Sequence, residues 1–356
     1  NASKPDLPYV RLETRHGLPA VTVNGAPFTW SGYASYDFQP GNVAEFGASG
    51  ANVFVVPVAA GSHLHQIVDP TWIGNDQWDF GDLDMRIAMA LQANPASMLA
   101  LRVNLALPPC WVEAHPNDRA LTRTDHGDIP WEETGSPAIS IASDIWRTQQ
   151  SEALHKLIAY CKEQPWANRI IAFILTGEVT EEWFAWACND GQYADYSLPM
   201  QTAFADWCKQ RNLPFTTVPN PASRQQPGWD WYPDDDAGSH AAAYARFLSE
   251  LTADVIAGFA KTVKDATDRR CLVGAFHGYV IQFAGEPRQH FSGHFDMGRL
   301  LECPDFDLFL GIPLHNYRAL FQGYDTYTTA VRSIHASGKL YLNENDLFSW
   351  LHQGLW

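Results

Sequence analysis

Apolar residues along the chain follow two alternating patterns. Continuous apolar runs of strand length, bounded by charged or turn-forming residues, are typical of strands buried on both faces of a parallel sheet. They predict seven strands, at 28–36, 51–58, 97–107, 170–177, 271–279, 306–313 and 339–343. Apolar residues at helical spacing lie between them and predict helices at 83–91, 146–163, 200–210, 241–266 and 327–336.

Strands that alternate with helices indicate a parallel α/β architecture. Seven strands are one short of an eight-stranded barrel, and too few residues follow Glu344 for an eighth strand to be evident. Residues 1–27 are expected to form a hairpin that caps the barrel, because Asn24-Gly25 is a strong tight-turn signal. The barrel would then occupy 28–356, with a long loop insertion at about 183–240.

Charge and hydropathy narrow the choice of partners. The chain has 24 Lys and Arg against 40 Asp and Glu, a net charge of −16, which disfavours nucleic acid and anionic membranes. No apolar run reaches the length of a membrane span, so a soluble protein with a neutral or small substrate is expected. A secreted, periplasmic or cytoplasmic location and a homo-oligomer are all compatible with the sequence.

Metal and cofactor motifs are not evident. The six cysteines show no C-x-x-C spacing, and His63 and His65 have no third ligand at a metal-binding spacing. The acidic run 234–236 lacks the spacing of a calcium loop and fits a solvated turn. Gly-x-Ser-x-Gly and Gly-x-x-x-x-Gly-Lys are absent. No cofactor and no catalytic metal are therefore expected.

Carboxylates follow two of the predicted strands. The apolar run 170–177 breaks into a cluster that holds Glu178, Glu181 and Glu182, and Glu344 follows the last strand. Barrels place their chemistry at the C-terminal ends of the strands. Glycoside hydrolysis needs two carboxyl groups that flank one bond, and Glu344 with one of the other three meets that need. The alternative is that these carboxylates cap helices or pair with arginine.

Polar and aromatic residues at the same strand ends suggest a cleft for a polyol. The candidate substrate-binding residues are Asn104, Trp111, Trp183, His277, Tyr279, His315, Asn316, Tyr317 and Asp346. A high aromatic content fits either a large core or surfaces that cover the apolar face of a sugar ring. Arg102 lies inside the third strand and needs an anion, which is either Glu344 or another acid.

A succession of short motifs resembles one family. They are Pro-Pro-Cys-Trp at 108–111 with His-Pro at 115–116, Gly-Glu-Val-Thr-Glu-Glu-Trp-Phe at 177–184, Ser-Gly-His at 292–294, Pro-Asp-Phe-Asp at 304–307, and Gly-Lys at 338–339 leading to Asn-Glu-Asn-Asp at 343–346. Together they resemble clan A glycoside hydrolases, and within them the β-galactosidase-like enzymes related to family 42.

This resemblance implies a (β/α)8 TIM barrel that hydrolyses a β-glycosidic bond with retention. The nucleophile carries over onto Glu344. The acid/base is ambiguous, since counting from the strand selects Glu178 and matching the Glu-Trp-Phe tail selects Glu182, which we prefer. The usual Asn-Glu pair and the zinc-binding cysteine cluster of some family 42 enzymes are absent. Alternatives are a non-catalytic carbohydrate-binding protein, a β-glucan or β-mannan hydrolase, and an inverting hydrolase. The sugar, the linkage and exo or endo action stay open.

Overall fold

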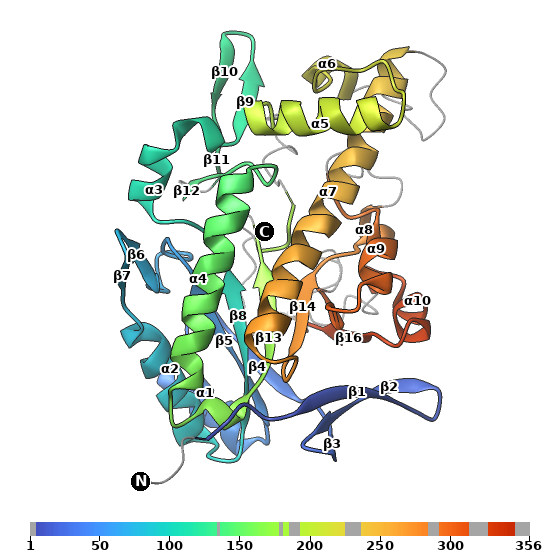
Figure 1. The fold of residues 1–356 in the computed structure, drawn as a ribbon. Coiled ribbons are helices and arrows are strands. Elements are labelled where there is room, and N and C mark those ends of the chain that lie inside the picture. Colours follow the sequence, from blue (N-terminus) through green and yellow to red (C-terminus); the bar gives the residue numbers. More distant parts are fainter. Residues whose placement is uncertain are drawn as a thin grey trace, which may run out of the picture.

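A parallel sheet forms the centre of the computed structural model, which describes residues 5–133, 136–177, 181–184, 193–224, 236–283, 292–312 and 327–345. Its seven strands follow chain order across the sheet. They are β4 (Gly32–Ala34), β5 (Val53–Ala59), β8 (Met98–Asn104), β13 (Ile170–Thr176), β14 (Leu272–Phe276), β15 (Leu308–Gly311) and β16 (Leu340–Asn343). All seven predicted strands are thus confirmed. This is the strand order of a (β/α)8 barrel (Figure 1).

An eighth strand is not found in the described part of the chain, where β4 and β16 are the two edges of the sheet. Residues 346–356 lie outside the described part of the chain. The prediction of a barrel is therefore confirmed for seven of its strands.

Helices cover the outer face of the sheet. The longer ones are α1 (Pro40–Ala48), α2 (Gly81–Ala93), α4 (Asp144–Lys162) and α7 (Asp236–Ala266), with α9 (Met297–Glu302) and α10 (Val331–Ala336) near the C-terminus. Another long helix, α5 (Leu198–Gln210), lies beyond the C-terminal ends of the strands, as Figure 1 shows. The start of α4 is set by Ser143, whose hydroxyl accepts the backbone N–H of Trp146 (3.1 Å). In Figure 1, α4 and α7 run side by side across the sheet. None of the helices in the described ranges is both long and apolar enough to cross a membrane.

Short elements decorate the C-terminal side of the barrel. They are the hairpins β6 (Trp72–Gly74) with β7 (Gln77–Trp78), β9 (Leu121–Thr124) with β10 (Gly127–Pro130), and β11 (Glu132–Glu133) with β12 (Ser136–Pro137), and the helices α3 (Pro109–Ala114), α6 (Pro221–Arg224) and α8 (Val280–Phe283). The sequence did not predict these hairpins, because each strand is too short to show an apolar alternation.

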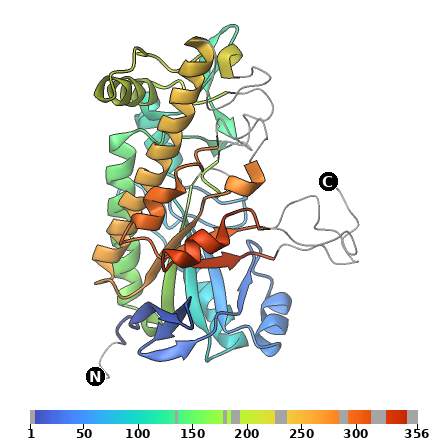
Figure 2. The same ribbon diagram turned by 90° about the vertical axis from the view of Figure 1, so that its right-hand side faces the viewer.

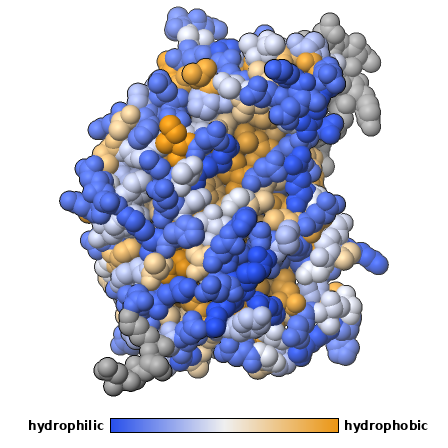
Figure 3. All heavy atoms as spheres, viewed as in Figure 1, coloured by the Kyte–Doolittle hydropathy of each residue, from blue (hydrophilic) through white to orange (hydrophobic). Residues whose placement is uncertain are grey.

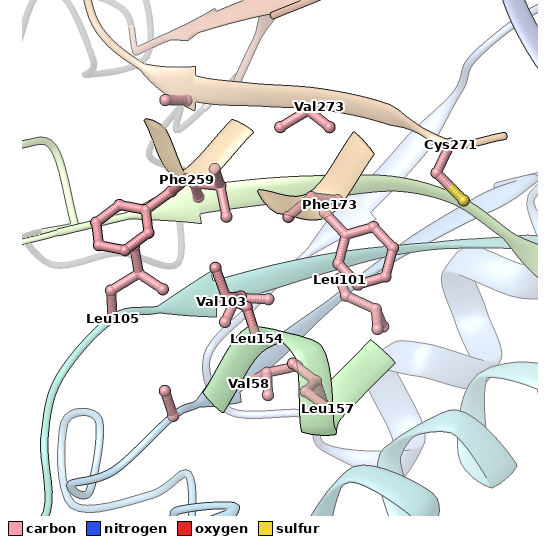
Figure 4. Packing of buried hydrophobic residues seen from close by; sticks show 14 of the residues in the cluster. Val58, Leu101, Val103, Leu105, Leu154, Leu157, Phe173, Phe259, Cys271 and Val273 are labelled. Atoms are coloured by element: carbon pink, nitrogen blue, oxygen red, sulfur yellow. The ribbon is translucent and has the colours of Figure 1, made fainter. Parts of the chain in front are cut away.

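Strand alternation decides which side chains enter the barrel. On β8, Leu101 and Val103 belong to the buried cluster between sheet and helices, and Figure 4 shows them pointing toward α4. Successive residues of a strand face opposite sides. Ala100, Arg102 and Asn104 therefore point into the barrel. An arginine on the inner row of a central strand is the feature around which the candidate site is built.

The N-terminal residues form a three-stranded antiparallel sheet, β1 (Val10–Arg15), β2 (Leu18–Val23) and β3 (Ala26–Phe28). The tight turn at Asn24-Gly25 joins β2 to β3, and a second turn at His16-Gly17, which the sequence did not indicate, joins β1 to β2. Val10 and Val21 belong to the same buried cluster as interior residues of the barrel. Figures 1 and 2 show this sheet at the foot of the barrel, away from α5.

Candidate active site

Arg102 lies at the centre of the site. Its buried guanidinium forms ion pairs with Glu181 (2.9 Å) and Glu344 (3.2 Å). Burial alone would lower the pKa of Arg102, but the two carboxylates outweigh burial and raise the pKa above its ordinary value. The prediction that Arg102 needs an anion is confirmed, and it pairs with both of the alternatives.

Glu181 is the buried partner of Arg102. Its Oε1 accepts the hydroxyl of Thr176 at the end of β13 (2.9 Å). Tyr36, just beyond β4, accepts a hydrogen bond from Nη2 of Arg102 (2.7 Å). Burial, followed by the charge of Glu181, raises the pKa of Tyr36, so its phenol stays neutral. Glu181 is fully buried and acts as a structural counter-charge to the arginine.

Glu344 is the partner that a substrate can reach. It directly follows β16, and its backbone N–H donates to the carbonyl of Gly311 at the end of β15 (2.8 Å). Three strands separate β8 from β16 in the sheet, so the ion pair between Arg102 and Glu344 crosses the barrel interior. The Glu344 side chain is 29% exposed, whereas that of Glu181 is 0% exposed.

The turn that carries Glu182 has an unusual backbone. Glu181 and Trp183 have φ angles of 67° and 55°, in the left-handed region that side chains disfavour. The N–H of Trp183 donates to the carbonyl of Gly177 (3.2 Å), and Nε2–H of His294 donates to the carbonyl of Glu182 (2.8 Å). A side chain at Gly177 would clash, because its Cβ would lie 2.7 Å from the Trp183 ring. Backbone strain of this kind is concentrated at functional sites.

Three buried polar side chains support Glu182. Burial and then the charges of Glu182 and Glu344 raise the pKa of Tyr279 well above its usual value, so its hydroxyl stays protonated. His277 and His294 stack with ring centroids 4.7 Å apart. Burial lowers the pKa of His277 to about 4, and burial together with His277 lowers that of His294. Both imidazoles are therefore neutral near pH 7.

A cavity of about 520 Å³ adjoins this cluster. Its walls come from the loop after β5, the end of β8 and the residues after it, the segment before α4 and the first turn of α4, and the turn after β13. His65 lines it, and the His65 ring packs against the Tyr36 ring with centroids 4.4 Å apart. Asn104 and Trp183, both predicted to bind substrate, also line it.

The other predicted residues are placed as follows. His277 and Tyr279 are fully buried and support the carboxylates without lining the cavity. Trp111 lies apart from the cavity lining, because its ring stacks on His115 (4.1 Å) and its indole N–H donates to Gln149. Glu178, His315, Asn316, Tyr317 and Asp346 lie outside the described residues.

Two site residues were missed by the sequence analysis. Tyr36 directly follows a strand, which is a usable signal, but an aromatic residue there also fits a core position. His65 was considered only as a metal ligand. Within the ranges that the structure describes, no group of three or more His, Cys, Asp or Glu could hold a metal ion.

Comparison with known proteins supports the fold. No family model matches the chain, and no curated protein matches it in sequence. Among solved structures, the catalytic domain of β-amylase from Paenibacillus polymyxa is similar, with a TM-score of 0.58 and 12% identity over 89% of this chain and 86% of that one. The β-galactosidase of the psychrophilic Marinomonas ef1 gives a TM-score of 0.53 and 13% identity over 82% of this chain.

A third solved structure, Gan42B, is a β-galactosidase of family GH42, with a TM-score of 0.50 and 12% identity over 80% of this chain. The aligned region spans 42% of the Marinomonas enzyme and 40% of Gan42B. At these identities the likeness concerns the fold. It confirms the (β/α)8 barrel, which the resemblance to family 42 implied.

Proposed function

We propose that the chain is a retaining β-glycosidase in which Glu344 is the nucleophile and Glu182 is the acid/base. One observation carries the proposal: Glu344, after β16, reaches across the barrel interior to Arg102 on β8, and the charges of Glu344 and of Glu182, in the turn after β13, both act on the buried Tyr279. Barrels of this kind place their chemistry at that end. Glycosidases act through two carboxyl groups on either side of the scissile bond.

Glu344 suits the role of the nucleophile. A carboxylate that attacks the anomeric carbon has to be ionised, oriented and accessible. The ion pair with Arg102 orients the Glu344 carboxylate, and the partial exposure of Glu344 leaves it open to the substrate. Glu181, the second carboxylate on the same guanidinium, lacks that access.

Glu182 suits the role of the acid/base. It lies next to Trp183 in the turn after β13, and its backbone carbonyl accepts a hydrogen bond from Nε2–H of His294. For a retaining mechanism, we expect its carboxyl group to lie about 5 to 5.5 Å from that of Glu344, against roughly 6.5 to 9.5 Å for an inverting one. Galactosides are the first substrates to test, because two of the similar solved structures are β-galactosidases.

Two variants test the assignment of roles. Glu344→Ala should lower turnover by about three orders of magnitude or more, and azide should restore part of it, because a small anion can replace the missing carboxylate. Glu182→Ala should lose far more activity on glycosides with poor leaving groups than on activated aryl glycosides. If only Glu178→Ala shows that leaving-group dependence, Glu178 is the acid/base and our choice is wrong.

A further inference from the structure

The cavity beside Trp183 differs in chemistry from a sugar site. Most of the side chains in its wall are apolar, and the larger ones are Leu64, Leu105, Leu107, Ile139, Ile141, Trp146 and Trp183. The polar residues that line it are fewer, and most come from the loop after β5. On the face seen in Figure 3, apolar side chains also gather between the upper parts of α4 and α7, below α5.

The position of the cavity relative to the carboxylates indicates which part of a substrate it takes. Neither Glu182 nor Glu344 lines the cavity, but Trp183, which follows Glu182 in the chain, forms part of the wall, whereas no residue next to Glu344 does. In a glycosidase the acid protonates the leaving oxygen, so the leaving group lies on the side of the acid. If Glu182 is the acid, the cavity is on the leaving-group side.

We propose that this cavity binds an apolar, aromatic aglycone and that the substrates are glycosides of aryl alcohols rather than oligosaccharides. The inference rests on the proposed function. A second sugar would bring hydroxyl groups against Leu105, Leu107 and Ile139, which cannot replace the hydrogen bonds that those hydroxyls make with water. An aromatic ring makes no such hydrogen bonds with water, and burial of its apolar surface contributes favourable binding free energy. The volume of about 520 Å³ lies in the range of sites for small organic molecules.

One polar group in the wall adds a feature to the expected ligand. Trp146 lines the cavity and is only 4% exposed, and in the described part of the chain its Nε1–H has no hydrogen-bond partner. A buried donor without a partner is costly, and a ligand oxygen can satisfy it. We therefore expect an aryl aglycone that carries a hydroxyl, ether or carbonyl group.

Binding of uncleavable thioglycosides separates the aglycone from catalysis. With the sugar held constant, calorimetry compares an S-methyl thioglycoside, an S-(2-naphthyl) thioglycoside and a thio-linked disaccharide on the whole chain. The naphthyl compound should bind at least roughly tenfold more tightly than the other two, because only its ring fills the apolar cavity. Equal affinities, or tightest binding of the disaccharide, would overturn the inference.

Variants locate the effect. Ile141→Gln puts a polar side chain into the wall and should remove most of the naphthyl preference without changing the affinity for the S-methyl compound. Ile145→Gln is the matched control, since Ile145 is exposed on α4 and does not line the cavity. Ile139→Gln is the second wall variant if Ile141→Gln does not fold. Equal losses in the wall and control variants would contradict the assignment.

Trp146→Phe tests the donor, since it keeps an aromatic ring and removes the N–H. It should weaken binding of a 6-hydroxynaphthyl thioglycoside more than that of the plain naphthyl compound. The failure of the proposed function looks different from the failure of this inference. A chain that cleaves no β-glycoside, whether aryl, alkyl or disaccharide, refutes the function. A chain that cleaves β-glycosides but binds all three thioglycosides equally refutes only the aglycone pocket.

Discussion

The two ends of the barrel each hold a buried cation, but they balance it differently. At the N-terminal ends of the strands, Lys264 pairs with Asp307 and donates to the carbonyl of Cys271. Asp307 also accepts the backbone N–H of Val273 (2.7 Å). At the C-terminal ends, Arg102 is shared by two glutamates. The charge of a third, Glu182, acts together with that of Glu344 on the pKa of Tyr279.

The difference separates stability from function. At the end that holds Lys264, one carboxylate balances one buried cation, and backbone groups form the remaining hydrogen bonds of both partners. A purely structural ion pair requires this. The arginine end has an excess of negative charge and two residues with left-handed backbone in one turn. Neither feature stabilises the fold, so both point to chemistry at that end.

The largest effects should come from removing each cation in turn. Arg102→Met and Lys264→Met should each lower the free energy of unfolding by about 3 to 5 kcal/mol, because each leaves a carboxylate without its partner. Only Arg102→Met should also abolish turnover per folded molecule. Urea unfolding and kcat corrected for the folded fraction measure the two effects. A similar loss of kcat in Lys264→Met would break the contrast between the ends.

Protonation of the buried histidines should destabilise the arginine end. His277 has a pKa of about 4 in the folded chain, against about 6.5 when unfolded. The unfolded chain therefore binds the proton more readily, and stability present above pH 6.5 is lost as the pH falls toward 4. The loss attributable to His277 should approach about 3 kcal/mol.

The exposed histidine His126 provides the control for the pH dependence of the unfolding free energy. His277→Gln should flatten the decline in unfolding free energy between pH 6.5 and 4, whereas His126→Gln, in the turn between β9 and β10, should leave the decline unchanged. An unchanged decline in His277→Gln would show that other groups cause it.

A smaller effect is expected from charge neutralisation at Glu181. Glu181→Gln leaves Arg102 paired with Glu344 and keeps an oxygen for the hydroxyl of Thr176. We expect kcat to fall by no more than about tenfold, far less than in Glu344→Ala, because Glu181 positions the arginine and does not touch the substrate. A loss as large as that of Glu344→Ala would make Glu181 a catalytic residue.

The smallest effect belongs to the turn between β1 and β2, far from the site. His16 has a φ of 51°, which asparagine tolerates better in a two-residue turn that ends in glycine. His16→Asn should raise the free energy of unfolding by about 0.5 kcal/mol and leave kcat unchanged. Thermal unfolding of the variant against the parent chain checks the gain.

Much of the fold could be predicted from the sequence, because long apolar runs and helical stripes are local signals. β13 and α4 were placed to within one or two residues. The same runs put Arg102 inside a strand and Glu344 after one. The ion pair between these two residues could not be predicted, because they are 242 positions apart in the sequence and meet only when the sheet curls. Likewise, no local pattern reveals that Glu181, and not its neighbour Glu182, forms the ion pair with Arg102.

Trapping of the glycosyl-enzyme intermediate tests the central claim most directly. A panel of activated 2-deoxy-2-fluoro β-glycosides, including the galacto, gluco and manno forms, is incubated with the chain, and the product is examined by intact-mass spectrometry and peptide mapping. We predict the addition of one fluoroglycosyl group, esterified to Glu344. A label on Glu181 or Glu182, or turnover of the matching glycoside with an inverted product and no label, would contradict the proposal.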